Sequence, residues 1–71
     1  MLNVCPINDR EWEVATVING ERSVVGSIRT DPNLDGYLLI DNAGPREGLG
    51  ANFEIVATHR AARRLAANWW G

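Results

Sequence analysis

Hydrophobic and polar residues alternate along residues 11–30, which is the pattern of β-strands with one buried face. The stretch is interrupted by Asn19-Gly20, a pair that favours the positive φ angles of a type I′ turn. On the return strand, Val24 and Ile28 fall on one face. The sequence therefore predicts an antiparallel hairpin turned at Asn19-Gly20.

Three further segments follow this hairpin. Residues 37–41 (YLLID) and 52–57 (NFEIVA) have the composition or alternation of strands, and the glycine-rich residues 42–51 between them predict a loop. Thr58 is a suitable N-cap for a helix that runs to the end of the chain. One apolar stripe marks the buried face of that helix; its members are Ala62, Leu65, Ala66 and Trp69.

These segments predict an α+β fold, with a three- to four-stranded antiparallel sheet and one C-terminal helix packed across one face. We expect a single domain over residues 1–71, in which residues 1–10 are a loose N-terminal segment, 11–57 form the sheet and 58–70 form the helix. A 71-residue chain has a thin core, so a homodimer or a permanent partner would add useful stability.

Composition indicates the cellular location and the source of the protein. Cys5 is the only cysteine, so an internal disulfide is excluded, and no apolar run reaches the roughly 18 residues of a membrane span. With no signal-like start, we expect a cytoplasmic protein with no membrane partner. The absence of lysine is typical of a GC-rich bacterial or phage source.

Charge is segregated along the chain. Residues 1–57 hold all nine acidic residues and four arginines, a net charge of −5, whereas residues 58–71 hold three arginines and no acid, a net charge of +3. An acidic body with a basic helix can orient a partner.

The stretch DPNLDG resembles the start of a calcium loop, since Asp31, Asn33 and Asp35 alternate before a glycine. A calcium loop of this kind needs a bidentate glutamate at its twelfth position, which here is Asn42. We therefore expect a turn between two strands, with weak calcium binding as the alternative, and we expect no cofactor.

Catalytic residues are not apparent. His59 is the only histidine and has no nucleophile and orienting group beside it in sequence, and Cys5 has no second thiol or histidine pair with which to bind a metal. The glycines of residues 44–50 do not have the spacing of a phosphate-binding loop. The sequence accordingly predicts a non-enzymatic protein.

The helix offers the clearest binding surface. Arg60, Arg63 and Arg64 project from one side, and Trp70 approaches that side. One interpretation is a solvated face that pairs with neighbouring carboxylates; the other is a surface for a protein or for phosphates. For Trp70, a contact with a partner or second copy and packing within the chain are both open.

Three functional hypotheses follow. The leading one is a protein-interaction module of bacterial or phage origin, which binds a protein partner or itself through the Arg/Trp helix and the sheet. The second is a nucleic-acid-associated module that uses the arginine face. The third is an acidic inhibitor, encoded by a phage or mobile element, that acts on a host protein. Its contact surface would consist of Glu11, Glu13, Asp31, Asp35 and Asp41.

Overall fold

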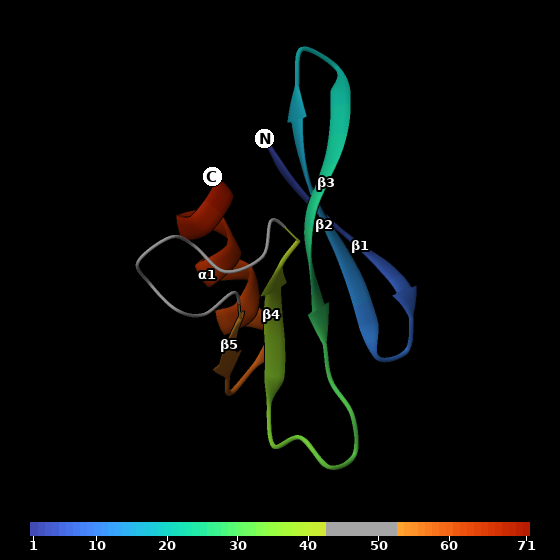
Figure 1. The fold of residues 1–71 in the computed structure, drawn as a ribbon, viewed down its shortest axis with the longest axis vertical. Coiled ribbons are helices and arrows are strands. Elements are labelled where there is room, and N and C mark those ends of the chain that lie inside the picture. The colour runs from blue at the N-terminus through green and yellow to red at the C-terminus, as the bar shows by residue number, and fades with distance from the viewer. Residues whose placement is uncertain (43–52) are drawn as a thin grey trace.

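The computed structural model describes residues 1–42 and 53–71, and it shows one C-terminal helix packed on an antiparallel sheet (Figure 1). The elements are β1 (Leu2–Asn8), β2 (Glu11–Ile18), β3 (Glu21–Arg29), β4 (Tyr37–Asp41), β5 (Phe53–Val56) and α1 (His59–Trp70). Consecutive strands are neighbours in the sheet, in the order β1-β2-β3-β4-β5. The α+β class and the packed helix are confirmed, whereas the described residues form five strands rather than three or four.

The additional strand is β1, which corrects the expectation of a loose segment over residues 1–10. It pairs with β2 in an antiparallel register that sets Val4 opposite Val14 and shifts only beyond Pro6. Leu2 and Val4 pack against the hydrophobic core, so burial of apolar side chains stabilises this strand.

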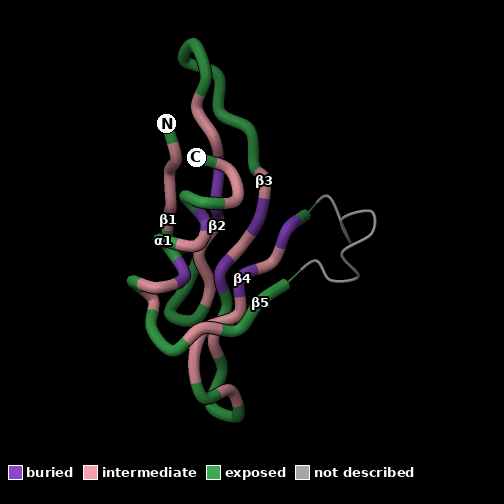
Figure 2. The backbone as a smooth tube through the Cα atoms, turned by 90° about the vertical axis from the view of Figure 1, so that its left-hand side faces the viewer, coloured by how far each residue is buried: buried purple, intermediate pink, exposed green. Residues whose placement is uncertain are grey.

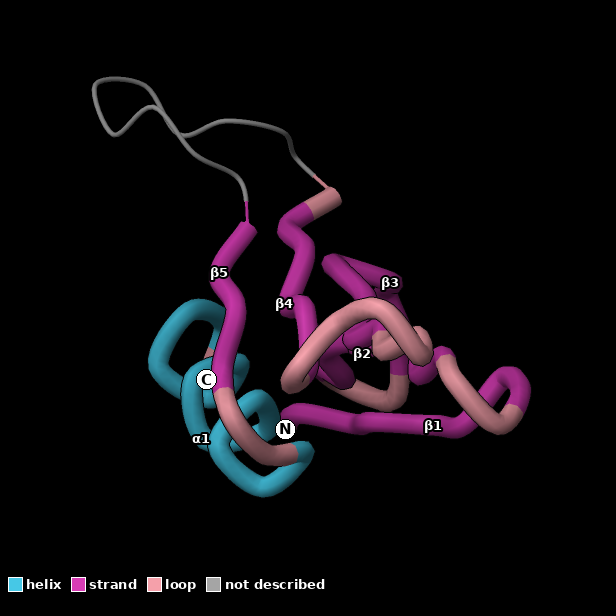
Figure 3. Tube along the Cα trace, turned by 90° about the horizontal axis from the view of Figure 1, so that it is seen from below, coloured by secondary structure: helices cyan, strands magenta, loops and turns pink. Residues whose placement is uncertain are grey.

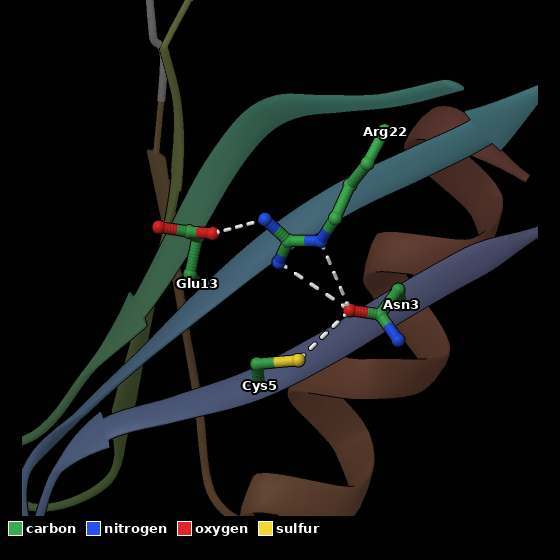
Figure 4. Close-up of polar contacts among 4 residues, drawn as sticks. All are labelled: Asn3, Cys5, Glu13 and Arg22. Carbon is green, nitrogen blue, oxygen red and sulfur yellow. Dashed lines mark hydrogen bonds and ion pairs between the residues drawn. The ribbon is translucent and has the colours of Figure 1, made fainter. Parts of the chain in front are cut away.

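A polar cluster on the helix-free face also holds β1 in place (Figure 4). The Oδ1 atom of Asn3 accepts a hydrogen bond from the Sγ of Cys5 at 2.8 Å, and from both Nε and Nη2 of Arg22 at 3.3 Å. The Nη1 of Arg22 donates to Glu13 Oε1 at 2.5 Å, which raises the pKa of Arg22. These side chains connect β1, β2 and β3.

The hairpin between β2 and β3 turns where the sequence predicts. Asn19 and Gly20 have φ angles of 53° and 80°, as a type I′ turn requires. The hairpin tip projects beyond the rest of the sheet and is exposed (Figures 1 and 2).

Closer to the core, the β2–β3 register shifts between Val14 and Ala15, and Val25 lies in the resulting bulge. The alternation of β2 itself is kept: Val14, opposite Val4, lies in the core beneath the helix, whereas Ala15, opposite Asn3, is buried on the other face of the sheet. The bulge changes the phase of β3, so Val25 packs against the core while Val24, expected on the face of Ile28, is 48% exposed.

The core lies between the sheet and the helix, and its fully buried members are Val14, Ile28, Leu39, Ala62 and Ala66. The sheet coils around α1, so strands at both of its edges, β1 and β5, contact the helix (Figure 3). The predicted stripe is confirmed, because Leu65 and Trp69 pack beside the two alanines. Thr58 caps the helix as expected, its Oγ1 accepting a hydrogen bond from the Ala61 amide at 3.0 Å.

The DPNLDG stretch is the connection between β3 and β4, which confirms the predicted turn. The Oδ1 of Asp31 accepts a hydrogen bond from the Asn33 amide at 2.7 Å, and the Asp31 carbonyl accepts one from the Leu34 amide at 3.0 Å. Within residues 1–42 and 53–71, no three His, Cys, Asp or Glu side chains are grouped to hold a metal ion. The expected glycine-rich loop, from residue 43 onward, lies outside the described residues.

Candidate functional site

An open groove of about 630 Å³ runs between the edge strand β1 and the first half of α1. We call it the arginine groove; it is lined by Leu2, Val4, His59, Arg60, Arg63 and Arg64. The helix supplies its four residues at positions i, i+1, i+4 and i+5, which share one side of a helix. The strand supplies two apolar side chains, so the groove combines a basic wall with an apolar one.

The three groove arginines are exposed and have no carboxylate partner in the described part of the chain. The ion pairs found there join Arg22 to Glu13 and Arg29 to Glu11. The interpretation that the helix arginines pair with neighbouring carboxylates is therefore not what the described residues show. Their positive charges remain available to an anionic partner.

His59 sits where the groove meets the core. Its ring packs against Trp12, with ring centroids 4.4 Å apart, and against Tyr37 at 5.6 Å. Burial lowers the pKa of His59, and the nearby positive charge of Arg63 lowers it further. The imidazole is consequently neutral at pH 7, and the charge of the groove comes from its arginines. The Nε2 atom is buried without a hydrogen-bond partner in the described residues.

Three groove residues were not predicted as binding residues: His59, which was considered only as a catalytic candidate, and Leu2 and Val4, because the N-terminal segment was expected to be loose. The sequence did contain a sign of this strand: apolar Leu2 and Val4 alternate with Asn3 and Cys5, and this alternation has the period of a strand. The stretch is short and precedes Pro6, which weakens a strand assignment. The segment is nevertheless a strand, because it pairs with β2.

Trp70 is not among the residues that line the arginine groove. Its indole lies over Gly26 of β3, so close that a side chain built on that glycine would meet the ring. Trp70 also packs edge-on against Trp69, with ring centroids 5.4 Å apart. Of the two interpretations, packing within the chain is the one observed.

The five acidic residues of the inhibitor hypothesis are not all exposed, and several of them already have partners within the chain. Glu11 and Glu13 are each bound by an arginine of β3, and Asp31 uses its carboxylate to hold the β3–β4 turn that also contains Asp35. Asp41 is buried, with 5% of its surface exposed.

The described residues contain no helix long and apolar enough to cross a membrane. No protein-family model, curated protein or solved structure matches this chain. The geometry and charge of the arginine groove are therefore the basis for a functional proposal.

Proposed function

We propose that this chain is a small non-enzymatic interaction module that binds an acidic segment of a partner protein in the arginine groove. The observation that carries the proposal is the convergence of three exposed arginines, without carboxylate partners among the described residues, on one groove with an apolar wall. Guanidinium groups bind carboxylates through paired hydrogen bonds, and adjacent apolar side chains add affinity when they are covered.

The test is a selection from a display library of random nonapeptides, with immobilised protein as bait. We expect aspartate and glutamate to be enriched over the input library for the wild type. Arg63→Glu should abolish that enrichment, because it reverses a central charge of the groove. The matched control is Arg10→Glu, the same change at an exposed arginine in the β1–β2 turn, which should preserve it.

Absence of acidic enrichment, or its equal loss in both variants, would contradict the proposal. The nucleic-acid hypothesis is tested on the same proteins with a labelled single-stranded oligonucleotide. It has less support, because three arginines on an otherwise acidic chain form a small basic field and phosphate contacts alone bind weakly at physiological salt.

Self-association is a second candidate, and it is favoured by a different observation. On the helix-free face of the sheet, Phe53 and Ile55 are 51% and 53% exposed and lie opposite Ile40 and Leu38. This group of cross-strand apolar pairs is the kind of surface that a second copy covers. Sedimentation equilibrium should then show a dimer that Phe53→Lys converts to a monomer; a monomeric wild type at all concentrations excludes it.

A further inference from the structure

The exposed edge of β1 indicates which backbone conformation a partner bound in the arginine groove adopts. β1 is the first strand in the sheet order and has a strand neighbour, β2, on one side. An edge strand exposes backbone N–H and C=O groups that pair readily with another extended chain. Which residues of β1 present those groups follows from the phase of its ladder with β2.

The phase is set by Met1 and Val17, which exchange two backbone hydrogen bonds: the Met1 nitrogen donates to the Val17 carbonyl at 3.0 Å, and the Val17 amide donates to the Met1 carbonyl at 2.8 Å. In an antiparallel ladder such pairs alternate with non-bonded pairs. Asn3 and Cys5, which lie opposite Ala15 and Glu13, therefore direct their backbone groups inward to β2.

The intervening residues of β1, at positions 2, 4 and 6, direct their backbone groups outward. Leu2 and Val4 each offer an N–H and a carbonyl, and both residues line the arginine groove. Pro6, the third outward position, has no N–H and ends the usable edge. The outward backbone groups of β1 and the three arginines thus belong to the same groove.

We infer that the partner segment is an extended acidic strand, which adds to the edge of β1 at Leu2 and Val4 and turns its carboxylates toward Arg60, Arg63 and Arg64. The inference rests on the proposed function and specifies its ligand. Side chains of a strand alternate between faces, so the carboxylates that meet the helix occupy every second position of the segment. Binding of this kind takes affinity from main-chain hydrogen bonds and specificity from alternate side chains.

Charge argues against a second copy as the occupant of this edge. Two β1 strands that pair edge to edge in antiparallel fashion would place both helices on the same face of a continuous sheet. Their arginine sides would then face each other across the junction, and like charges brought together are unfavourable. An acidic strand from another protein removes that conflict.

The experiment uses two blocked heptapeptides of identical composition and charge. In the alternating peptide, Thr-Glu-Thr-Glu-Thr-Glu-Thr, the glutamates occupy every second position; in the segregated peptide they are contiguous. Fluorescence anisotropy should give about tenfold tighter binding for the alternating peptide, since only it can place all three carboxylates on the helix side of a strand. Equal affinities would overturn strand addition while leaving the proposed function in place.

Backbone pairing is tested without altering the protein. The alternating peptide is N-methylated either at its glutamates or at its threonines, two sets that differ by one position in phase. The N–H groups of a strand point alternately toward and away from its neighbour, so one set should lose binding and the other retain it. Retention by both sets, or equal loss in both, would overturn the inference.

Two measurements on the protein complete the test. Hydrogen exchange followed by NMR should show new protection of the Val4 amide on binding the alternating peptide, with the inward Asn3 and Cys5 amides protected beforehand.

The second measurement uses Val4→Pro, which removes the outward N–H at this position, just as the natural Pro6 lacks one. This variant should weaken binding about threefold to tenfold, the effect of one hydrogen bond. Val4→Ala keeps that N–H and serves as the control. Absence of binding by either peptide would overturn the inference together with the proposed function, whereas binding without Val4 protection would overturn the inference alone.

Discussion

At the scale of single residues, Gly26 decides where the C-terminal tryptophan packs. From the sequence, Trp70 could either extend toward a partner or fold back, because adjacent tryptophans on a helix cannot both face the same core. A buried glycine in β3 leaves the space that the indole of Trp70 fills. This contact joins residues that are far apart in the chain, and local periodicity therefore gives no sign of it.

Replacing Gly26 with alanine should destabilise the fold. The added methyl group would overlap the Ile40 carbonyl oxygen and lie 2.5 Å from the Cη2 atom of Trp70, so backbone and indole would both have to shift. Overpacking of this kind costs about 1–3 kcal/mol, which urea denaturation would measure as a lower free energy of unfolding. Ser27→Ala, at the next position, should change that free energy by no more than about 0.5 kcal/mol. Equal stability of the two variants would contradict the packing of Trp70 against Gly26.

His59 should make stability depend on pH. Its pKa in the folded protein lies below the ordinary value of 6.5, because of burial and then Arg63, so the unfolded chain binds more protons as the pH falls through that value. The contribution of a neutral His59 to the free energy of unfolding is therefore complete above pH 6.5, and it is lost as the pH decreases below that value. Urea denaturation at about pH 7.5 and pH 5.5 should show a smaller decrease for His59→Phe, which keeps an aromatic ring but cannot titrate. An identical decrease in wild type and variant would rule out this assignment.

At the scale of elements, strong local signals predicted what was observed. The helix and its cap followed from Thr58 and the apolar stripe, and the hairpin followed from Asn19-Gly20. β1 and the bulge at Val25 did not follow, because both depend on pairing between strands rather than on the segment alone. The bulge is what turns Val25 toward the core and leaves Val24 exposed.

The N-cap of α1 provides a test at this scale. Thr58→Ala removes the oxygen that accepts the Ala61 amide and leaves that donor without its side-chain partner. The expected loss is about 1 kcal/mol in the free energy of unfolding, measured by urea denaturation followed by circular dichroism. Thr58→Ser keeps a hydroxyl and should lie close to the wild type. A Thr58→Ala protein as stable as Thr58→Ser would show that the cap contributes little.

At the scale of the whole molecule, the thin core and the segregated charges act together. The sequence predicted an acidic body and a basic helix, but the arginine groove exists only because the meander returns α1 to the side of β1, the first strand in the chain. No single segment contains that groove, and this is why only its arginines were predicted. A domain with so small a core has modest stability, so a ligand that binds only the folded state should raise it measurably.

This linkage gives the final prediction. A ligand present at 100 times its dissociation constant adds about 2.7 kcal/mol to the free energy of unfolding, or roughly 10–20 °C in the melting temperature of a domain of this size. The alternating peptide should produce such a shift in wild type and in Arg10→Glu, but not in Arg63→Glu at the same peptide concentration. Because the contacts are charged and partly exposed, the shift should shrink as salt rises from about 0.05 to 0.5 M. A shift of equal size in all three proteins would place the binding site outside the arginine groove, and a shift unaffected by salt would argue against carboxylate–guanidinium contacts as its source.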